Sequence, residues 1–415
     1  MLKKSKLNSQ YIATGNAMRL FTGSPNKWNN QTQRVEHIPT CYQLGLLLCG
    51  GLGMFHSFHI VLELVKVQDS SESSNSDPSQ KQKGGLNDRV VFGTIFVILN
   101  YLTLHCSYTM LKEGKLVEGF INGLLQLEDD HVKGHSLNMF LVGFSDKWKV
   151  RQVKSIAIFI RVMAQRLSPF LIGLAAVKHQ KQLMNILLYP PGNYLIQIWS
   201  YLPNEKVAEI GAKFTTFAVS SWVYMVIMKV DAVLIIQVAI GTVGLSQMIK
   251  LQLNEMRQSS LRNLINTYRR IQLLASVFNK IHSKVIVLLF ITVLTSQIMS
   301  TLKLIHAVRG NDNSTVGVRL YYVRVLVTSI IVINTVYGFC GDVSFFSEKF
   351  VKHMRHCARV TPGRKCSKMF WKMIISLPII KIEFGPSNFI EKLTPIMFQQ
   401  FATLRVIDAM LVIYQ

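Results

Sequence analysis

Seven stretches of the chain are apolar over a length of about 20 residues. A helix rises about 1.5 Å per residue and the hydrocarbon layer of a bilayer is about 30 Å thick, so each stretch can cross it once. Because a backbone in lipid must satisfy its own hydrogen bonds, these stretches predict helices. The predicted fold is an all-α, polytopic membrane protein with seven transmembrane helices, at 44–65, 90–110, 155–177, 214–249, 285–305, 320–339 and 393–413.

Two of these stretches depart from a simple span. The fourth is longer than one crossing needs and contains Lys229 and Asp231, so two spans with a turn between them are the alternative. We interpret it as one span, because 228–231 offers no Gly, Pro or Asn to reverse the chain and a tilted or projecting helix absorbs the excess length. The seventh is the least apolar, since it carries Arg405 and Asp408.

The basic residues of the connecting segments predict the orientation. The amino-terminal segment and the connections that follow spans two, four and six together contain 30 Lys and Arg residues. The connections that follow spans one, three and five contain 11. Because cationic loops are retained in the cytosol, the amino terminus is predicted to be cytosolic and the carboxyl terminus extracellular. A glycosylation pattern at Asn313 falls outside in this scheme, whereas a second pattern at Asn30 falls inside.

The cytosolic side is predicted to hold helical extensions of the spans. Between spans four and five, 261–281 places apolar residues at helical spacing, and we expect a helix that continues into span five and packs against other helices; lying flat on the membrane is the alternative. A second helix is expected over 342–354. The segment 370–385 is too short to cross and contains Pro378, so it is interpreted as a buried or interfacial piece before the last span.

The predicted organisation has four parts. A basic cytosolic segment occupies 1–41, and transmembrane helices one to six with the ligand-pocket region occupy 42–340. A cytosolic helix and re-entry segment occupy 341–392, and the last transmembrane helix, lining a pore, occupies 393–415.

The sequence contains none of the usual catalytic, metal or cofactor patterns. The glycine-rich 50–53 lies within span one, where small residues typically mark close helix packing, and His56 and His59 have no further ligands at metal-binding spacing. Ser, Cys and His occur without a motif that sets a nucleophile beside its base. The net charge of +24 is spread between the spans, which favours membrane topology over nucleic-acid binding. We therefore predict no enzyme, no metal site, no cofactor and no nucleic-acid partner.

Charged side chains within spans are costly in lipid unless they are paired or hydrated. Arg405 and Asp408 are three residues apart on the last span. An internal salt bridge is one interpretation of these two residues. The other is that the carboxylate lines a water-filled path, since acidic rings attract ions in cation pores.

The end of the chain resembles the closing pattern of arthropod gustatory receptors, which is Thr-Tyr, five mostly aliphatic residues and then Gln-Phe. Gln415 matches the Gln and 410–414 the aliphatic run, while Asp408 and Ala409 stand where Thr-Tyr would be and the Phe is absent. The segment 377–401 resembles the short piece, turn and re-entry of family members. The chain is thus similar to the insect-type gustatory receptor family of the seven-transmembrane gustatory and odorant receptor superfamily.

This resemblance implies a chemosensory receptor of the plasma membrane that acts as a ligand-gated, non-selective cation channel. A small-molecule tastant or odorant would bind among spans two to six, and the last spans of a homo- or hetero-tetramer would form the pore. By position, the pore-lining candidates are Gln400, Asp408, Val412 and Gln415. Aromatic residues toward the outer halves of spans give the ligand-pocket candidates Phe92, Phe170, Tyr321 and Tyr322, for which ordinary packing is the alternative.

Two other classes of function are left open. The chain could be a receptor that signals through cytosolic partners of its basic loops, or a carrier for a small solute. Carriers often contain internal repeats of spans, and the sequence shows none.

Overall fold

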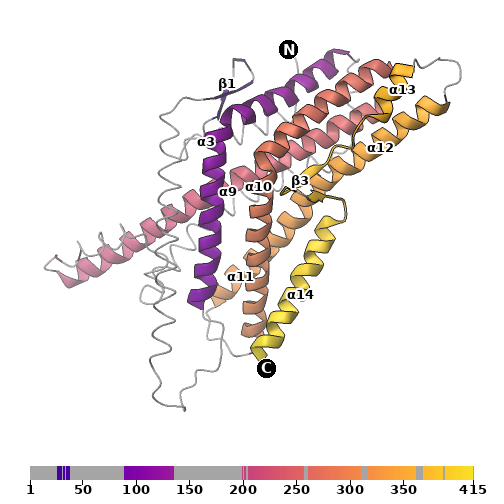
Figure 1. Ribbon diagram of the computed structural model, residues 1–415. Helices are drawn as coiled ribbons and strands as arrows, with labels where there is room; N and C mark the ends of the chain where they lie inside the picture. Colours follow the sequence, from indigo (N-terminus) through magenta and orange to yellow (C-terminus); the bar gives the residue numbers. More distant parts are fainter. Residues whose placement is uncertain are drawn as a thin grey trace.

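The computed structural model is a group of long helices that cross and bend around one central helix, α10 (Figure 1). It describes residues 26–29, 31–32, 34–37, 88–134, 199, 201, 204–256, 260–309, 316–360, 368–386 and 388–414. The helices are α3 (Asp88–Gly134), α9 (Glu205–Glu255), α10 (Leu261–Val308), α11 (Val316–Val332), the π-helix η3 (Ile333–Tyr337), α12 (Gly338–Val360), α13 (Lys368–Ile375) and α14 (Thr394–Tyr414). The strands are β1 (Asn26–Asn29), β2 (Arg34–His37), β3 (Ile382–Phe384) and β4 (Asn388–Ile390).

Helix α10 begins where the sequence supplies a cap. The Ser260 hydroxyl accepts a hydrogen bond from the Asn263 N–H at 3.3 Å, which satisfies one of the free donors of the first turn. The apolar residues that follow at helical spacing are buried against α3, α9 and α12 side chains, and they include Ile265, Tyr268 and Ile271 at 0% exposure. The helix then continues without a break to Val308. The predictions of packing and of continuation into 285–305 are confirmed.

Helix α9 contains the whole of the long fourth apolar stretch, 214–249. Its cap is Asn204, whose side chain accepts from the N–H groups of Lys206 and Val207 at 3.2 and 3.4 Å. The helix runs unbroken through Lys229 and Asp231 to Glu255. The stretch 214–249 is therefore one helix, and the extra length lies in the end of α9 that projects from the rest (Figure 1).

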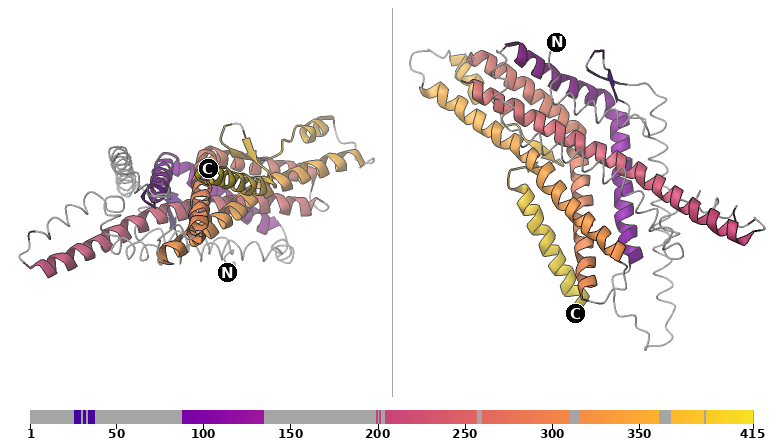
Figure 2. Two further views of the ribbon diagram at one scale, coloured as in Figure 1. Left: turned by 90° about the horizontal axis from the view of Figure 1, so that it is seen from below. Right: turned by 180° about the vertical axis from the view of Figure 1, so that it is seen from behind.

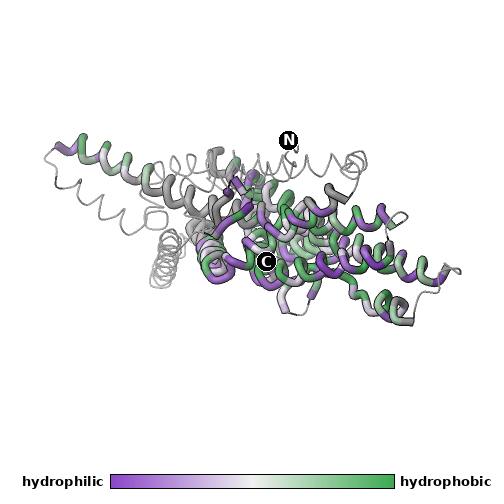
Figure 3. Tube along the Cα trace, turned by 90° about the horizontal axis from the view of Figure 1, so that it is seen from above, coloured by the Kyte–Doolittle hydropathy of each residue, from purple (hydrophilic) through white to green (hydrophobic). Residues whose placement is uncertain are grey.

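The helices form two regions. Parts of α3, α9, α10 and α12 run together toward α13, while α14, α11 and the other ends of α3 and α10 extend away from that bundle (Figures 1 and 2). Seen from above, the bundle toward α13 carries hydrophilic residues interleaved with hydrophobic ones along its helices (Figure 3). This pattern fits the predicted cytosolic extensions, because a helix surface that faces water alternates in polarity.

Among the described residues, two helical stretches are long and apolar enough to cross a bilayer, by length and composition. They are Leu261–Val308, which contains the predicted span 285–305, and Tyr322–Arg359, which covers all but the first two residues of the predicted span 320–339. The predicted spans 44–65 and 155–177 lie outside the described residues. The count of seven spans and the orientation of the termini stay predictions.

Two small hairpins correct the expectation of a purely helical chain. β1 and β2 pair antiparallel with Asn26 opposite His37, and β3 and β4 pair with Ile382 opposite Ile390. Strands of three or four residues are too short for an alternating pattern to stand out in a sequence. The second hairpin turns at Gly385, whose φ of 71° lies in the left-handed region that glycine adopts without strain.

The first hairpin joins the amino-terminal segment to α3. The Asn122 side chain accepts from the Val35 N–H at 3.0 Å and donates to the Val35 carbonyl at 2.8 Å. Val35 itself is 2% exposed and belongs to the main hydrophobic core. Part of the predicted basic segment is thus folded onto the stretch of α3 that follows its predicted span.

The last third of the chain contains a π-helix where the run 320–339 nears its end. η3 interrupts the path from α11 to α12 over five residues, and Tyr337 within it donates a hydrogen bond to the Ile286 carbonyl of α10 at 2.8 Å. A π-turn inserts an extra residue and rotates the face that follows, and such turns occur frequently at functional sites. Here it directs Tyr337 toward the start of α14.

Candidate functional site

Helix α14 is attached to the rest of the molecule along a single stripe. Pro395, Ala402 and Val406 are buried at helical spacing and face α10 and η3, against which α14 packs. Its other faces are exposed and largely apolar, with Met397 at 63%, Leu404 at 59% and Leu411 at 59% exposure. A helix whose apolar surface is mostly uncovered is suited to contact lipid or other protein chains.

A clamp of hydrogen bonds holds the segment before α14 against α10 and α12. The Tyr268 hydroxyl donates to the Pro378 carbonyl at 2.8 Å, so the Ser347 hydroxyl, 2.7 Å away, donates to Tyr268. Ser347 in turn accepts from the Ile380 N–H at 2.6 Å. Burial raises the pKa of the Tyr268 phenol, against the smaller opposite effect of its hydrogen bond with Ser347. The phenol is therefore neutral, and it can donate its proton in the hydrogen bond to the Pro378 carbonyl.

A second anchor holds strand β3. The Asn279 side chain of α10 donates to the Lys381 carbonyl at 2.9 Å and accepts from the Glu383 N–H at 3.2 Å. The segment 377–382 is also buried through Leu377, Ile380 and Ile382. Of the two interpretations of 370–385, buried or interfacial, the burial of these three residues favours the first, while Pro378 and Ile379 between them are exposed.

Removal of the Tyr268 hydroxyl tests the clamp. Tyr268→Phe leaves the Pro378 carbonyl and the Ser347 hydroxyl with unmet hydrogen bonds in a buried place, so we expect a loss of about 1–3 kcal/mol of stability. A lower thermal midpoint of the detergent-purified protein would report it. Tyr201→Phe, at a position 85% exposed, is the matched control and should leave the midpoint unchanged. Equal midpoints for the two variants would contradict the clamp.

Four aromatic rings meet where β3, η3, α10 and α14 come together. Phe290 lies 4.0 Å from Phe398, 5.4 Å from Phe384 and 6.1 Å from Tyr337, measured between ring centroids. Phe398 is also 5.4 Å from Tyr337 and 5.6 Å from Phe384. Aromatic pairs with centroids about 4.5–7 Å apart stabilise beyond their buried area, and every pair except Phe290–Phe398 lies in that range. The cluster therefore ties the first turns of α14 to three other elements.

Backbone also meets backbone near the start of α14. A Cβ added to Gly341 of α12 would lie 2.6 Å from the Glu391 carbonyl oxygen and 2.8 Å from the Lys392 Cα. Glu391 donates its N–H to the Thr394 hydroxyl at 2.8 Å, which fixes the entry into α14. Glycine is required here because only a residue without a Cβ allows this close approach.

Further along, a pair of amides joins α14 to α10. Gln297 Nε2 donates to Gln399 Oε1 at 2.7 Å, and Gln297 is 7% exposed. The remaining atoms of the two amides, Gln297 Oε1 and Gln399 Nε2, are buried and have no hydrogen-bond partner among the described residues. Sequence reasoning did not single out either residue, although a glutamine within an apolar span is the kind of signal that marks an interhelical contact.

The predicted pore residues lie on the uncovered faces of α14. Gln400 and Asp408 are exposed, and little more than two helical turns separate them on the side away from the buried stripe. Val412, 77% exposed, flanks them. Gln415 lies outside the described residues.

Asp408 is paired on its own helix. Arg405 Nη1 lies 3.1 Å from Asp408 Oδ2, with the two side chains 56% and 59% exposed, and the Arg405 guanidinium stands 4.9 Å from the centre of the Phe401 ring. An exposed ion pair of this kind contributes about 0.2–1 kcal/mol. The internal salt bridge is therefore present, and both charges still face outward.

Of the four predicted pocket residues, the structure describes the side chain of one. Tyr322 of α11 is 2% exposed. Phe92 and Tyr321 lie in α3 and α11, but their side chains are outside the described set, as are Phe170 and the glycosylation candidate Asn313.

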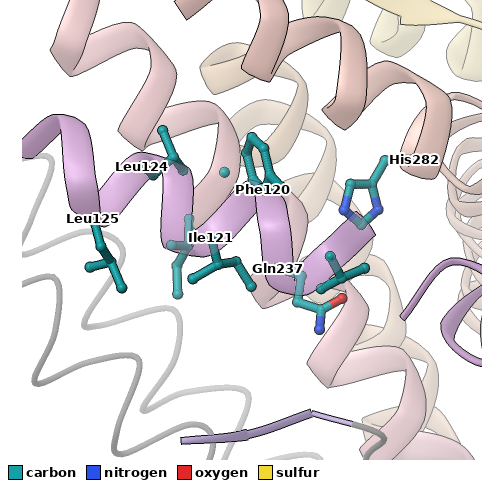
Figure 4. A pocket seen from close by; sticks show the side chains of 9 residues that line it. Phe120, Ile121, Leu124, Leu125, Gln237 and His282 are labelled. Atoms are coloured by element: carbon teal, nitrogen blue, oxygen red, sulfur yellow. The ribbon is translucent and has the colours of Figure 1, made fainter. Parts of the chain in front are cut away.

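A small cavity lies elsewhere, between α3, α9 and α10 (Figure 4). Phe120, Ile121 and Leu124 of α3 close one side, and Gln237 of α9 and His282 of α10 complete it. Burial lowers the pKa of His282 to about 3, so its imidazole is neutral. The volume of about 20 Å³ suits one water molecule and is too small for a tastant. In the described part of the chain, no group of three or more His, Cys, Asp or Glu could hold a metal ion.

Two solved structures have a similar fold. The insect olfactory receptor OR5 from Machilis hrabei matches with a TM-score of 0.58 at 13% sequence identity, over 98% of this chain and 98% of that chain. The same receptor in complex with eugenol matches with a TM-score of 0.56 at 13% identity, over 99% and 98%. No protein-family model and no curated protein matches the chain. The chain is thus a mostly helical protein with the fold of an insect olfactory receptor, and its structural neighbours are receptors.

Proposed function

We propose that the chain is a subunit of a chemosensory, gustatory-like receptor in the plasma membrane that acts as a ligand-gated, non-selective cation channel. Four copies, or copies together with related subunits, surround a pore lined by α14. A small tastant or odorant binds among the spans before it. Support for a receptor comes from the fold, which this chain and the olfactory receptor share over nearly their full lengths.

The observation that carries the pore assignment is the surface of α14. If this helix crossed a bilayer surrounded only by lipid, Arg405 and Asp408 would stand as an outward-facing charge pair in hydrocarbon, at a high cost. Both charges are tolerated if their face lines a water-filled path. The exposed apolar residues farther around the helix from the charges, such as Ile396 and Ile407, then meet lipid or the adjacent subunits.

The elements at the base of α14 fit the opening of such a pore. The hairpin β3–β4, the aromatic cluster and Gly341 fix where α14 starts, whereas its far end is held by α10 along one stripe. If a ligand shifts α10 or α11, the movement would therefore be transmitted to α14 through the contacts of Gln297 and Phe290. This arrangement can convert binding into movement of the pore helix.

Electrical recording tests the proposal. We expect that a cell expressing this chain alone, or with a related subunit, carries an inward current in response to some members of a panel of small organic compounds that includes eugenol. The current should reverse near zero potential in mixed sodium and potassium solutions, because a non-selective pore passes both. In detergent the purified protein should form four-fold particles.

Three results would overturn the proposal. Monomers in detergent would remove the pore. A second-messenger response without current would indicate a receptor that acts through cytosolic partners. Saturable uptake of a labelled solute without current would indicate a carrier.

A further inference from the structure

One face of α3 carries a stripe of buried polar side chains in the middle of the predicted span 90–110. Asn100, Thr103 and Ser107 follow one another at helical spacing, and they are 1%, 2% and 2% exposed. Apolar Val97 and Leu104, both half-buried, lie on the same face as Asn100. Polar groups at this depth of a membrane protein are costly and therefore usually serve a purpose.

The hydroxyls of the stripe use their protons within the helix. Thr103 Oγ1 donates to the Leu99 carbonyl at 2.9 Å, and Ser107 Oγ donates to the Thr103 carbonyl at 2.9 Å. This is the ordinary way in which Ser and Thr satisfy their donors inside an apolar helix. These two residues need no ligand to explain their burial.

Asn100 is different because its whole amide is unsatisfied within the part of the chain that the structure describes. There, neither Nδ2 nor Oδ1 has a hydrogen-bond partner, although the residue is 1% exposed. Nearly all buried polar groups in proteins are hydrogen-bonded, so an amide with neither group satisfied indicates an occupant that is absent from the protein itself. Lipid chains and other subunits cannot reach a side chain that is covered to this extent. The occupant must be small enough to enter the interior.

The chemistry of the amide selects the occupant. Nδ2 has two hydrogens to donate and Oδ1 has lone pairs to accept, so a full match needs a group that both donates and accepts. A hydroxyl does this with a single oxygen. An ether, ester or carboxylate only accepts and would leave Oδ1 unmet, and a hydrocarbon would leave the whole amide unmet.

We propose that Asn100 is the hydrogen-bonding residue of the ligand site and that the ligand is a small neutral alcohol or phenol. The apolar, half-buried Val97 and Leu104, three and four residues from Asn100 on the same face of α3, suit a molecule that is otherwise hydrocarbon. This inference rests on the proposed function, since it names the ligand class of that receptor.

Pairs of compounds that differ only in the hydroxyl provide the test. Octanol and its isomer methyl heptyl ether form one pair, and para-ethylphenol and para-ethylanisole form another. We expect the hydroxyl member of a pair to be at least about tenfold more potent in evoking current, because a site built to bond a hydroxyl rejects the analogue that lacks it. Ligand-induced thermal shift of the purified protein gives a second readout that needs no current.

Substitution of the amide should remove this preference. In Asn100→Leu the two members of a pair should become equally potent, through loss of potency of the hydroxyl compound. Asn100→Ser, which keeps a donor and an acceptor, should retain part of the preference, and it also serves if Asn100→Leu does not fold. The matched control is Tyr101→Phe, which removes a hydroxyl from the adjacent residue, 55% exposed, and should change neither potency.

Each alternative gives its own result. A structural water on Asn100 predicts that Asn100→Leu weakens both members alike and leaves their ratio unchanged, which would overturn the inference. Activation or thermal stabilisation only by compounds without a hydroxyl would overturn it as well. If hydroxyl compounds stabilise the protein against heat in an Asn100-dependent way but evoke no current, the ligand class stands and the channel function fails.

Discussion

Alanine at position 341 is expected to displace the start of α14 and to abolish most of the ligand-evoked current. The new Cβ would lie 2.6 Å from the Glu391 carbonyl oxygen and 2.8 Å from the Glu391 carbonyl carbon and the Lys392 Cα, so it meets backbone that cannot rotate aside. Overpacking of this kind costs about 1–3 kcal/mol. The strain falls on the residues that lead into α14, where Thr394 fixes its entry.

Gly338→Ala is the matched control for this variant. Gly338 lies one turn earlier in the same helix, and a Cβ added there meets no atom within 4 Å. Both variants gain the helix propensity of alanine over glycine, about 1 kcal/mol, so the difference between them isolates the contact with Glu391 and Lys392. We expect a lower thermal midpoint and a lost current for Gly341→Ala alone. If the two variants behave alike, α12 does not hold the start of α14.

The long helices were predictable because they are written in local sequence. In α10 the residues that repeat at helical spacing, among them Leu264, Tyr268 and Phe278, are those that the structure buries. The absence of a turn residue around Lys229 and Asp231 correctly predicted one helix in place of two. Periodicity and helix-breaking residues act over a few positions, so a single sequence reveals them.

The contacts that position α14 were not predictable in the same way. Gln297 and Gln399 are 102 residues apart, and Tyr268 and Pro378 are 110 apart. Which polar side chain meets which depends on how two helices are turned about their axes, and that is set by packing over their whole length. The hairpin β3–β4 was missed for another reason, since its three-residue strands show no alternation.

The candidate site residues also differ in how far local sequence could predict them. Gln400, Asp408 and Val412, which were chosen for their position near the chain end, are exposed, and their place in a pore stays a proposal. The ligand-pocket prediction rested on aromatic residues and did not include Asn100. An asparagine in a span is tolerated when it finds a partner on a neighbouring helix. Only the structure reveals that both amide groups of Asn100 are buried and have no partner among the described residues.

Neutralising Arg405 and neutralising Asp408 are expected to change ion permeation in opposite directions. Asp408 and Arg405 oppose each other at 3.1 Å, so a ring of four subunits would present four carboxylates beside four guanidiniums. Arg405→Gln uncovers the carboxylates and should raise the permeability of cations relative to anions by about tenfold, because an acidic ring concentrates cations. Asp408→Asn leaves the guanidiniums and should lower that ratio by a similar factor.

Reversal potentials in dilution gradients measure these ratios, and the double variant should return close to the wild-type value. Assembly should be intact in all three, because an exposed pair within one helix contributes only about 0.2–1 kcal/mol. Glu348→Gln is the matched control, since it removes one carboxylate from another exposed pair, with Lys352, on α12 outside the predicted spans. Unchanged permeation in both single variants would mean that Arg405 and Asp408 only neutralise each other, and that a different face of α14 lines the pore.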